Sequence, residues 1–227
     1  MTGAARGRRV APLPRARLGD HVYDELLARL LSNRLEPGER LAIDALAREL
    51  GVSQTPIREA MQRLEAGGVV VRTHLAGYRV APQLTREQFD ELVQVRLLLE
   101  PAAARWAAER MDDDAVAHLR GLVDSLEAAA GEPEGTSYAV FAGLDAQFHD
   151  AVAAGSGNGV VRDCLARMHT HVKLLRLSSG RGVRTEAVEE HQAVVDAVAA
   201  HDAEAAAAAM LHHVQRSASR FAPAFDD

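Results

Sequence analysis

One stretch, residues 37–80, constrains the fold of this chain more than any other. It reads PGERLAIDALARELGVSQTPIREAMQRLEAGGVVVRTHLAGYRV. Leu46, Ala47 and Leu50 form the apolar stripe of a first short helix. Gly51 follows, and a glycine there supplies the positive φ with which a chain leaves a helix and turns sharply.

A second helix and a hairpin follow that turn. Ser53 stands at the N-cap position, and Pro56 falls in the first turn, where its missing N–H has no helical partner. Gly67 and Gly68 end the helix, whose buried face consists of Ile57, Ala60, Met61 and Leu64. Two short strands are predicted next, at 69–71 and 78–80. Helix, turn, helix and a two-stranded wing form a DNA-binding arrangement, in which the second helix enters the major groove.

The predicted DNA contacts are polar residues off the apolar stripe of that second helix, together with residues of the wing. Several of them lie at the N-terminal end of the helix, the part that approaches base edges. We therefore predict DNA contacts from Ser53, Gln54, Thr55, Arg58, Arg63, Arg72, His74 and Gly77.

The same stretch resembles the winged-helix domain of the GntR family of bacterial transcription regulators. The words PGERL, GVSQTPIREA and RLEAGG carry the resemblance, which covers residues 18–81. Many relatives have a basic residue in place of Gln54, and one well-known relative has another near Ala45. The operator sequence of those relatives is therefore not carried over to this chain.

Charge divides the 227 residues into two parts. Residues 1–80 contain 13 Lys/Arg and 9 Asp/Glu, net +4, whereas residues 81–227 contain 13 and 23, net −10. A basic N-terminal part suits DNA phosphates, which the acidic remainder repels. We predict a disordered basic arm at 1–17 that touches DNA or has no role. The other predicted parts are a winged-helix domain at 18–81, an effector-binding and dimerisation domain at 82–222, and a tail at 223–227.

Cysteine content and hydropathy indicate a cytoplasmic protein. Cys164 is the single cysteine, so no intrachain disulfide can form. No apolar run reaches the ~18 residues of a membrane span. The basic N-terminus lacks the apolar core of a secretory signal. We expect no membrane partner.

From residue 82 onward the pattern is helical. The predicted fold class is therefore mainly α, with an N-terminal winged helix-turn-helix followed by an all-α antiparallel bundle of about six helices. Glycine-rich loops such as GSGNG separate the helices. The expected helical segments are 85–111, with Pro101 as a kink or break, and 112–131, 137–154, 158–178, 185–200 and 202–221.

Histidines form a second constellation in this bundle. Asp145 and His149 are four residues apart and share one helix face. His191 is in register with apolar valines, and His213 follows Met210 on the inward stripe of the last helix. Three imidazoles and one carboxylate suit a first-row divalent ion. Each histidine could also be an ordinary core or surface residue.

Residues 85–220 resemble the FCD ligand-binding domain of the FadR-type branch of GntR regulators, through VRLLLEPAAA, DAQFHDAVAAGSGN and EHQAVVDAVAAHDAEAAAAAMLHHV. The resemblance implies that Asp145, His149, His191 and His213 hold a divalent metal: zinc, nickel, manganese or cobalt. His212 competes with His213 but lies ~100° around the helix. The other histidines are interpreted as surface or outer groups: His118, His169, His171 and His201.

Arg96 in VRLLLE matches an arginine found near the family's effector pocket. It would clamp a small carboxylate effector beside the metal. The alternative is a surface salt bridge with Glu100, four residues later. Asn158 matches a helix-start residue of the family and is expected to act as a cap.

The resemblance implies a ligand-responsive transcriptional regulator, in particular a repressor. A homodimer would place two winged helices on a palindromic double-stranded operator. One alternative is a metal-dependent enzyme of the hydrolase type, although no His-Glu-x-x-His word or general base supports it. The other is a constitutive DNA-binding protein whose metal is structural.

Overall fold

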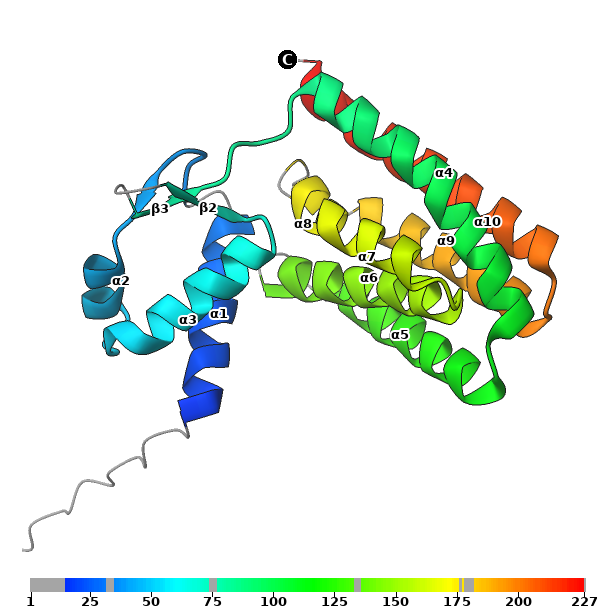
Figure 1. Cartoon of the computed structure of the whole chain (residues 1–227), viewed down its shortest axis with the longest axis horizontal. Helices are drawn as coiled ribbons and strands as arrows, with labels where there is room; N and C mark the ends of the chain where they lie inside the picture. The colour runs from blue at the N-terminus through cyan, green and yellow to red at the C-terminus, as the bar shows by residue number, and fades with distance from the viewer. Residues whose placement is uncertain are drawn as a thin grey trace, which may run out of the picture.

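The computed structural model describes residues 15–31, 35–73, 77–132, 136–175, 177 and 182–226. Figure 1 shows a winged-helix head followed by a helical bundle, joined by an extended segment. The fold class predicted from the sequence is confirmed. Within the described ranges, no helix is long and apolar enough to cross a membrane.

The head contains three helices and a small antiparallel sheet of order β1-β3-β2. Val70 pairs with Val80, and Arg72 pairs with Tyr78. The sequence pattern does not reveal β1, because two residues are too few to show strand alternation. The elements are α1 (Arg15–Leu31), β1 (Arg40–Leu41), α2 (Ile43–Glu49), α3 (Gln54–Ala66), β2 (Val70–Thr73) and β3 (Gly77–Val80).

The predicted helix-turn-helix is present, with one local difference. Gly51 and Gly68 have φ of 65° and 70° and follow α2 and α3, as glycines with positive φ do at helix ends. Ser53 occupies the N-cap position of α3, but its side chain makes no capping hydrogen bond. The first turn of α3 therefore relies on other groups for its free N–H donors.

The bundle follows the predicted helical segments closely, except at two places. Pro101 lies inside α4 without ending it. The segment predicted as one helix at 158–178 is two helices, because His169 adopts a left-handed φ of 50° between them. The elements are α4 (Arg86–Arg110), α5 (Asp113–Gly131), α6 (Thr136–Gly155), α7 (Gly159–Met168), α8 (Thr170–Leu175), α9 (Gly182–Ala199), α10 (Ala203–Phe221) and η1 (Ala222–Phe225).

Caps and packing fix these helices around one apolar core. Thr85 and Gln88 form a capping box at the start of α4, and Asn158 accepts from the Val161 N–H at the start of α7, as predicted. α4 and α10 run side by side, and α9 lies against both (Figure 1). Apolar positions at helical spacing on five helices fill the interior, including Leu119, Leu126, Phe148, Val194 and Met210. This packing carries α6, α9 and α10 to a common centre.

The predicted arm and tail are only partly covered by the structure. Residues 1–14 of the arm lie outside the described residues, and α1 begins at Arg15. In the tail, η1 extends to Phe225, and residue 227 lies outside the described residues. The boundary at 81/82 stays a prediction; residues 81–85 connect β3 to α4.

Candidate metal centre and nucleic-acid interface

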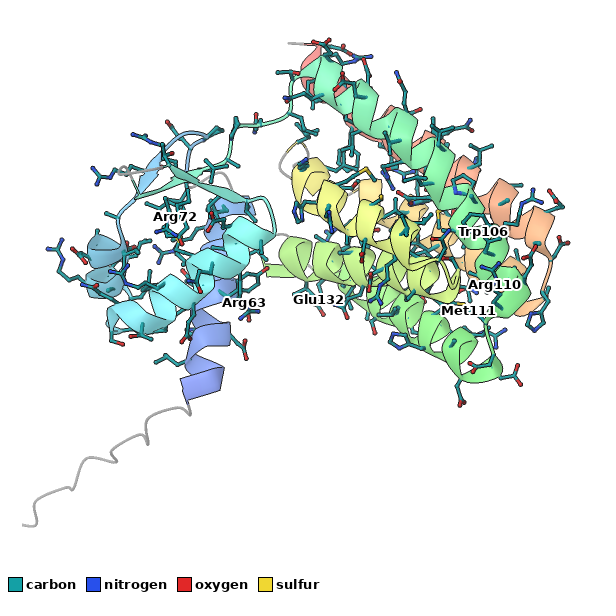
Figure 2. All side chains as sticks on the ribbon, in the orientation of Figure 1. Arg63, Arg72, Trp106, Arg110, Met111 and Glu132 are labelled. Atoms are coloured by element: carbon teal, nitrogen blue, oxygen red, sulfur yellow. The ribbon has the colours of Figure 1, made fainter. Side chains whose placement is uncertain are left out.

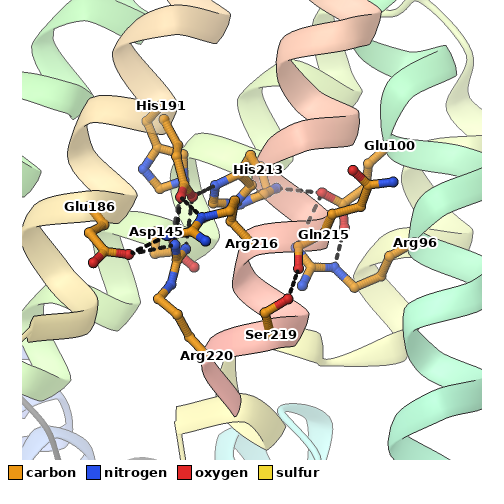
Figure 3. Close-up of polar contacts among 12 residues, drawn as sticks. Arg96, Glu100, Asp145, Glu186, His191, His213, Gln215, Arg216, Ser219 and Arg220 are labelled. Carbon is orange, nitrogen blue, oxygen red and sulfur yellow. Dashed lines mark hydrogen bonds and ion pairs between the residues drawn. The ribbon is translucent and has the colours of Figure 1, made fainter. Parts of the chain in front are cut away.

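Three histidines from three helices converge in the interior of the bundle. His149 of α6, His191 of α9 and His213 of α10 are 7%, 0% and 3% exposed. Each offers one nitrogen, and the three nitrogens lie within 4.8 Å of one another. The Asp145 Oδ1 lies 3.3 Å from His191 Nε2 and 4.0 Å from His149 Nε2. Figure 3 shows Asp145, His191 and His213 directed toward the same point. The four residues singled out in the sequence therefore lie together.

Helix register decides which histidines of α9 and α10 enter this cluster. His213 shares the buried stripe of α10 with Met210 and Ser217, whereas its neighbour His212 is exposed. His191 is in phase with Val194, which is also fully buried. His212 faces solvent instead, because each residue turns ~100° around the helix axis.

A carboxylate and an arginine lie behind His149. The His149 Nδ1 is 2.7 Å from Glu100 Oε2, and Arg96 Nε donates to Glu100 Oε1 at 2.6 Å. Burial alone would raise the pKa of Glu100, but Arg96 and His149 outweigh it and hold the pKa well below its usual value. Glu100 is therefore an ionised acceptor, and His149 Nδ1 lies within ion-pair distance of it.

His213 has an equivalent arrangement from other helices. Its Nδ1 lies 2.9 Å from Glu190 Oε2, and Arg220 binds both oxygens of Glu190 at 2.5 and 2.8 Å. Burial would raise the pKa of Glu190, but hydrogen bonds from Arg220 and His213 lower it to about 2. We refer to Arg96–Glu100–His149 and Arg220–Glu190–His213 as the two Arg–Glu–His chains.

The two carboxylates favour the tautomer of each histidine that carries its proton on Nδ1. A neutral imidazole that donates through Nδ1 carries a lone pair on Nε2. The Nε2 atoms of His149 and His213 face each other at 3.2 Å. Burial, the largest influence, lowers the pKa of His213, which favours its neutral form. Two facing lone pairs require a cation or a shared proton between them. Carboxylates that orient imidazoles in this way are usual behind metal-binding histidines.

The cluster could hold a divalent ion, and the sequence did not reveal every residue that supports it. Three imidazole nitrogens and one carboxylate oxygen suit zinc, nickel, manganese or cobalt. Glu190 and Arg220 were not predicted as part of the site. The sequence EEH offers two glutamates beside His191, and only the packing of α9 against α10 turns Glu190 toward His213.

Arg96 does not stand free for a ligand in this structure. It is 1% exposed and donates to both oxygens of Glu100, at 2.6 and 3.4 Å. The alternative from the sequence, a salt bridge with Glu100, is therefore present, but it is buried rather than on the surface. Its part in effector binding stays a prediction.

A cavity of about 240 Å³ opens beside the cluster, and we call it the inner cavity. It lies between α4, α6, α7 and α8, and its walls include Glu100, His149, Asp150, Arg162, His169 and Thr170. Arg162 forms a two-pronged ion pair with Asp150 at 2.9 and 2.7 Å. The hydrogen bond from Arg162 lowers the pKa of Asp150. A small ligand in this cavity would contact the cluster through His149.

The remaining histidines differ from one another. His118 is exposed, as expected. His201 is largely exposed, but its Nδ1 lies 2.8 Å from the Ala108 carbonyl oxygen. His169 is half-buried in the wall of the inner cavity, where burial lowers its pKa. The side chain of His171 lies outside the described residues.

The predicted reading surface at the start of α3 is exposed. Ser53, Gln54, Thr55 and Arg58 are all solvent-accessible. Arg58 Nη2 donates to Gln54 Oε1 at 3.1 Å, and Gln54 Nε2 donates to Asp44 Oδ1 at 2.6 Å. These hydrogen bonds hold two polar side chains at the N-terminal end of the helix, where base contacts are made.

The other predicted DNA contacts are more varied in position. Arg63 pairs with Asp20 at 2.9 Å and lies 3.9 Å from the centre of the Tyr23 ring, so it holds α3 to α1. Arg72 is exposed on β2 (Figure 2). Gly77 is exposed at the start of β3 with a φ of 80°. His74 lies outside the described residues.

Comparison with known proteins gives matches along most of the chain. Residues 18–80 match the family model described as bacterial regulatory proteins, gntR family, and residues 91–216 match the FCD domain. A probable D-xylose utilization operon transcriptional repressor of Paenarthrobacter nicotinovorans is 32% identical, covering 89% of this chain and 88% of the relative. The Nta operon transcriptional regulator of Aminobacter aminovorans is 29% identical, covering 82% and 86%.

Solved structures match the fold. E. coli McbR/YncC has a TM-score of 0.67 at 23% identity, covering 90% of this chain and 96% of the solved one. A putative GntR regulator from Rhodococcus sp. RHA1 has a TM-score of 0.66 at 20% identity, covering 91% and 97%. At these identities the likeness concerns the fold alone.

Proposed function

Because this chain belongs to the gntR family of bacterial regulatory proteins and carries the FCD domain of its FadR-type branch, it is a DNA-binding transcriptional regulator and not an enzyme, and we propose that it is a repressor controlled by a small organic acid. One relative is named a probable transcriptional repressor of a D-xylose utilization operon, and this name supports repression rather than activation. The observation that carries the proposal is the convergence of the His149 and His213 Nε2 atoms beside a cavity whose wall includes His149.

The proposed metal ligands are Asp145, His149, His191 and His213. When bound, a divalent ion supplies a positively charged centre that accepts carboxylate oxygens. The residues of the chain do the rest. Glu100 and Glu190 orient two imidazoles, and the arginines behind them keep these carboxylates ionised.

The proposed effector is a carboxylate, because a divalent ion accepts carboxylate oxygens. The bundle is net negative and repels anions at a distance, so this local positive centre is needed to retain one. Direct clamping by Arg96 requires its buried pair with Glu100 to open. One relative is named for a D-xylose utilization operon, so D-xylose is the competing candidate ligand. A neutral sugar would gain less than a carboxylate from the charge of the metal, so the two are separable by experiment.

A homodimer is proposed to present two α3 helices to a palindromic operator. Two of the most exposed large apolar side chains are Leu98 of α4, 73% exposed, and Val160 of α7, 74% exposed, and these helices contact each other. A second copy would cover them. Leu98→Glu should therefore lower the molecular mass in light scattering to that of a monomer, whereas Val140→Glu, at an exposed position of α6, should not.

The test of the function combines metal analysis with a ligand screen. Purified protein should contain close to one divalent ion per chain, and organic acids should raise its melting temperature only when metal is present. Metal content without any acid response would indicate a structural metal in a constitutive DNA-binding protein. A response to D-xylose but to no acid would overturn the proposed ligand class.

A further inference from the structure

We propose that the ligand carries two acidic groups, one at the metal and one at Arg162, so that the site selects dicarboxylates over monocarboxylates. This inference rests on the proposed function and adds the ligand class and a residue to it. Arg162 is the only arginine or lysine in the described wall of the inner cavity. It lies on α7, whereas His149, the contact to the metal cluster, lies on α6.

Arg162 stands at the mouth of this cavity. A second, more open depression of about 490 Å³, the outer groove, is bordered by Met111, His118 and Gly155. The inner cavity and the outer groove share Ala146, Asp150 and Arg162. The Arg162–Asp150 ion pair therefore lies between them, and a ligand that enters from the groove passes it.

The guanidinium of Arg162 can change its partner. Its side chain is 48% exposed and that of Asp150 is 46% exposed, and exposed ion pairs contribute little stability. Arg162 presents two N–H groups to the two oxygens of Asp150. A ligand carboxylate has the same shape and charge, so it can replace Asp150 on the same fork.

The other charges of the cavity leave Arg162 as the available cation. Glu100 is already neutralised by Arg96 and His149, and the Arg96 guanidinium is turned toward Glu100. Burial favours neutral His169. The volume of about 240 Å³ is below the roughly 300–1,000 Å³ of drug-sized ligand sites, which indicates a compact molecule.

The experiment is a calorimetric titration of the metal-loaded full chain with matched acids: malonate against propionate, succinate against butyrate, and glutarate against valerate. For at least one pair, the dicarboxylate should bind about tenfold or more tightly, as expected for a charge-assisted hydrogen-bonded pair. Arg162→Gln should remove this preference while leaving the monocarboxylate affinity unchanged. Arg167→Gln, an exposed position on the same helix, is the control and should keep the preference.

Asp150→Asn gives an independent readout, because it removes the competitor for Arg162. Dicarboxylate affinity should rise several-fold in this variant, which a purely structural ion pair would not produce. Binding of acids without a preference, or a preference that survives Arg162→Gln, overturns the inference and leaves the proposed function intact. If no acid of either kind binds the metal-loaded protein, the proposed function fails, and this inference with it.

A different observation, at the other end of the same cavity, leads us to infer that His169 transmits ligand binding to α3. His169 joins α7 to α8, and its φ of 50° is uncommon for a non-glycine residue. Its ring lines the inner cavity and also faces Gly68, in the turn that ends α3. A Cβ placed on Gly68 would lie 3.0 Å from His169 Cδ2. The imidazole is therefore in contact with the cavity and with the end of the reading helix.

His169→Ala should separate ligand binding from the DNA response. Calorimetry gives the ligand concentration that saturates the variant, and at that concentration the ligand should no longer change the affinity for DNA. His118→Ala, at the exposed edge of the outer groove, should keep the response. A full response in His169→Ala would overturn this inference, and so would loss of ligand binding itself, because His169 would then be a ligand contact only.

Discussion

At the scale of single residues, the candidate centre depends on two glutamates that are not among the proposed metal ligands. Glu100 and Glu190 are each 9% exposed or less, and each connects an arginine to an imidazole Nδ1. The arginine keeps the carboxylate ionised, and the carboxylate holds the Nδ1 proton. As a result, the opposite nitrogen of each ring presents a lone pair to the centre of the bundle.

Replacing Glu190 with Gln should lower metal affinity by about 10–100-fold, the range found for groups that orient metal-binding histidines. The amide keeps the size of the side chain but loses the charge that holds Arg220 and the His213 proton. Competition with a chromogenic chelator measures the change. Glu204→Gln on α10 is the control, because Glu204 forms an exposed ion pair with Arg105 of α4. Equal metal affinity in Glu190→Gln and the wild type would contradict the assigned tautomer.

Within α10, the identity of the ligand histidine can be tested directly. His213→Ala and His191→Ala should each remove most of the bound metal, whereas His212→Ala should retain it, because His212 is exposed. Elemental analysis of the purified variants measures the difference. A metal-free His212→Ala variant would contradict the helix register that places His213 inward and His212 outward.

Arg58 is the residue on which DNA reading is best tested. Arg58→Ala should weaken operator binding by ~1–3 kcal/mol if the guanidinium contacts a base edge. Arg63→Ala should weaken it less, because Arg63 is engaged with Asp20 and Tyr23 on α1. Anisotropy titrations at moderate salt compare the two, and equal affinities for Arg58→Ala and the wild type would refute the assignment.

At the scale of elements, two glycines of α6 show how packing determines whether a helix position tolerates a larger residue. A Cβ on Gly155 would lie 2.7 Å from Met111 Cγ, whereas a Cβ on Gly143 would meet nothing within 4 Å. Gly155 is therefore required by the close approach of Met111. Gly143 only adds conformational freedom to the unfolded chain.

Alanine should accordingly have opposite effects at these positions. Gly155→Ala should destabilise the protein by about 1–3 kcal/mol, because buried Met111 must move. Gly143→Ala should stabilise it by about 0.5–1 kcal/mol. Urea unfolding of the metal-loaded protein measures both. Two changes of the same sign would mean that the contact between α6 and Met111 is not formed as described.

Prediction from sequence succeeded where a local pattern determines an element. The stop at Gly51 and the inward phase of His191 follow from spacing alone. The break at His169 did not, because the apolar pattern continues across it. The inner cavity was also not predictable, since its walls come from four helices.

At the scale of the whole molecule, a positively charged head and a negatively charged bundle share one chain. The head approaches DNA, whereas the bundle provides the cavity and the metal ligands. Besides the segment 81–85, the two halves touch where α1 contacts α6 and where Gly68 faces His169. A ligand can act on DNA binding only if it favours one arrangement of these halves over another.

The most direct test of the account is a DNA-binding titration of metal-loaded and metal-stripped protein, with and without the organic acid found by calorimetry. The duplex is one selected from a random pool by the protein itself. The acid should weaken DNA binding of the metal-loaded protein by about 5–150-fold, the usual range of coupling between two sites, and should leave DNA binding of the metal-stripped protein unaffected. Equal affinities with and without the acid, in protein that demonstrably holds both metal and acid, would contradict the central claim.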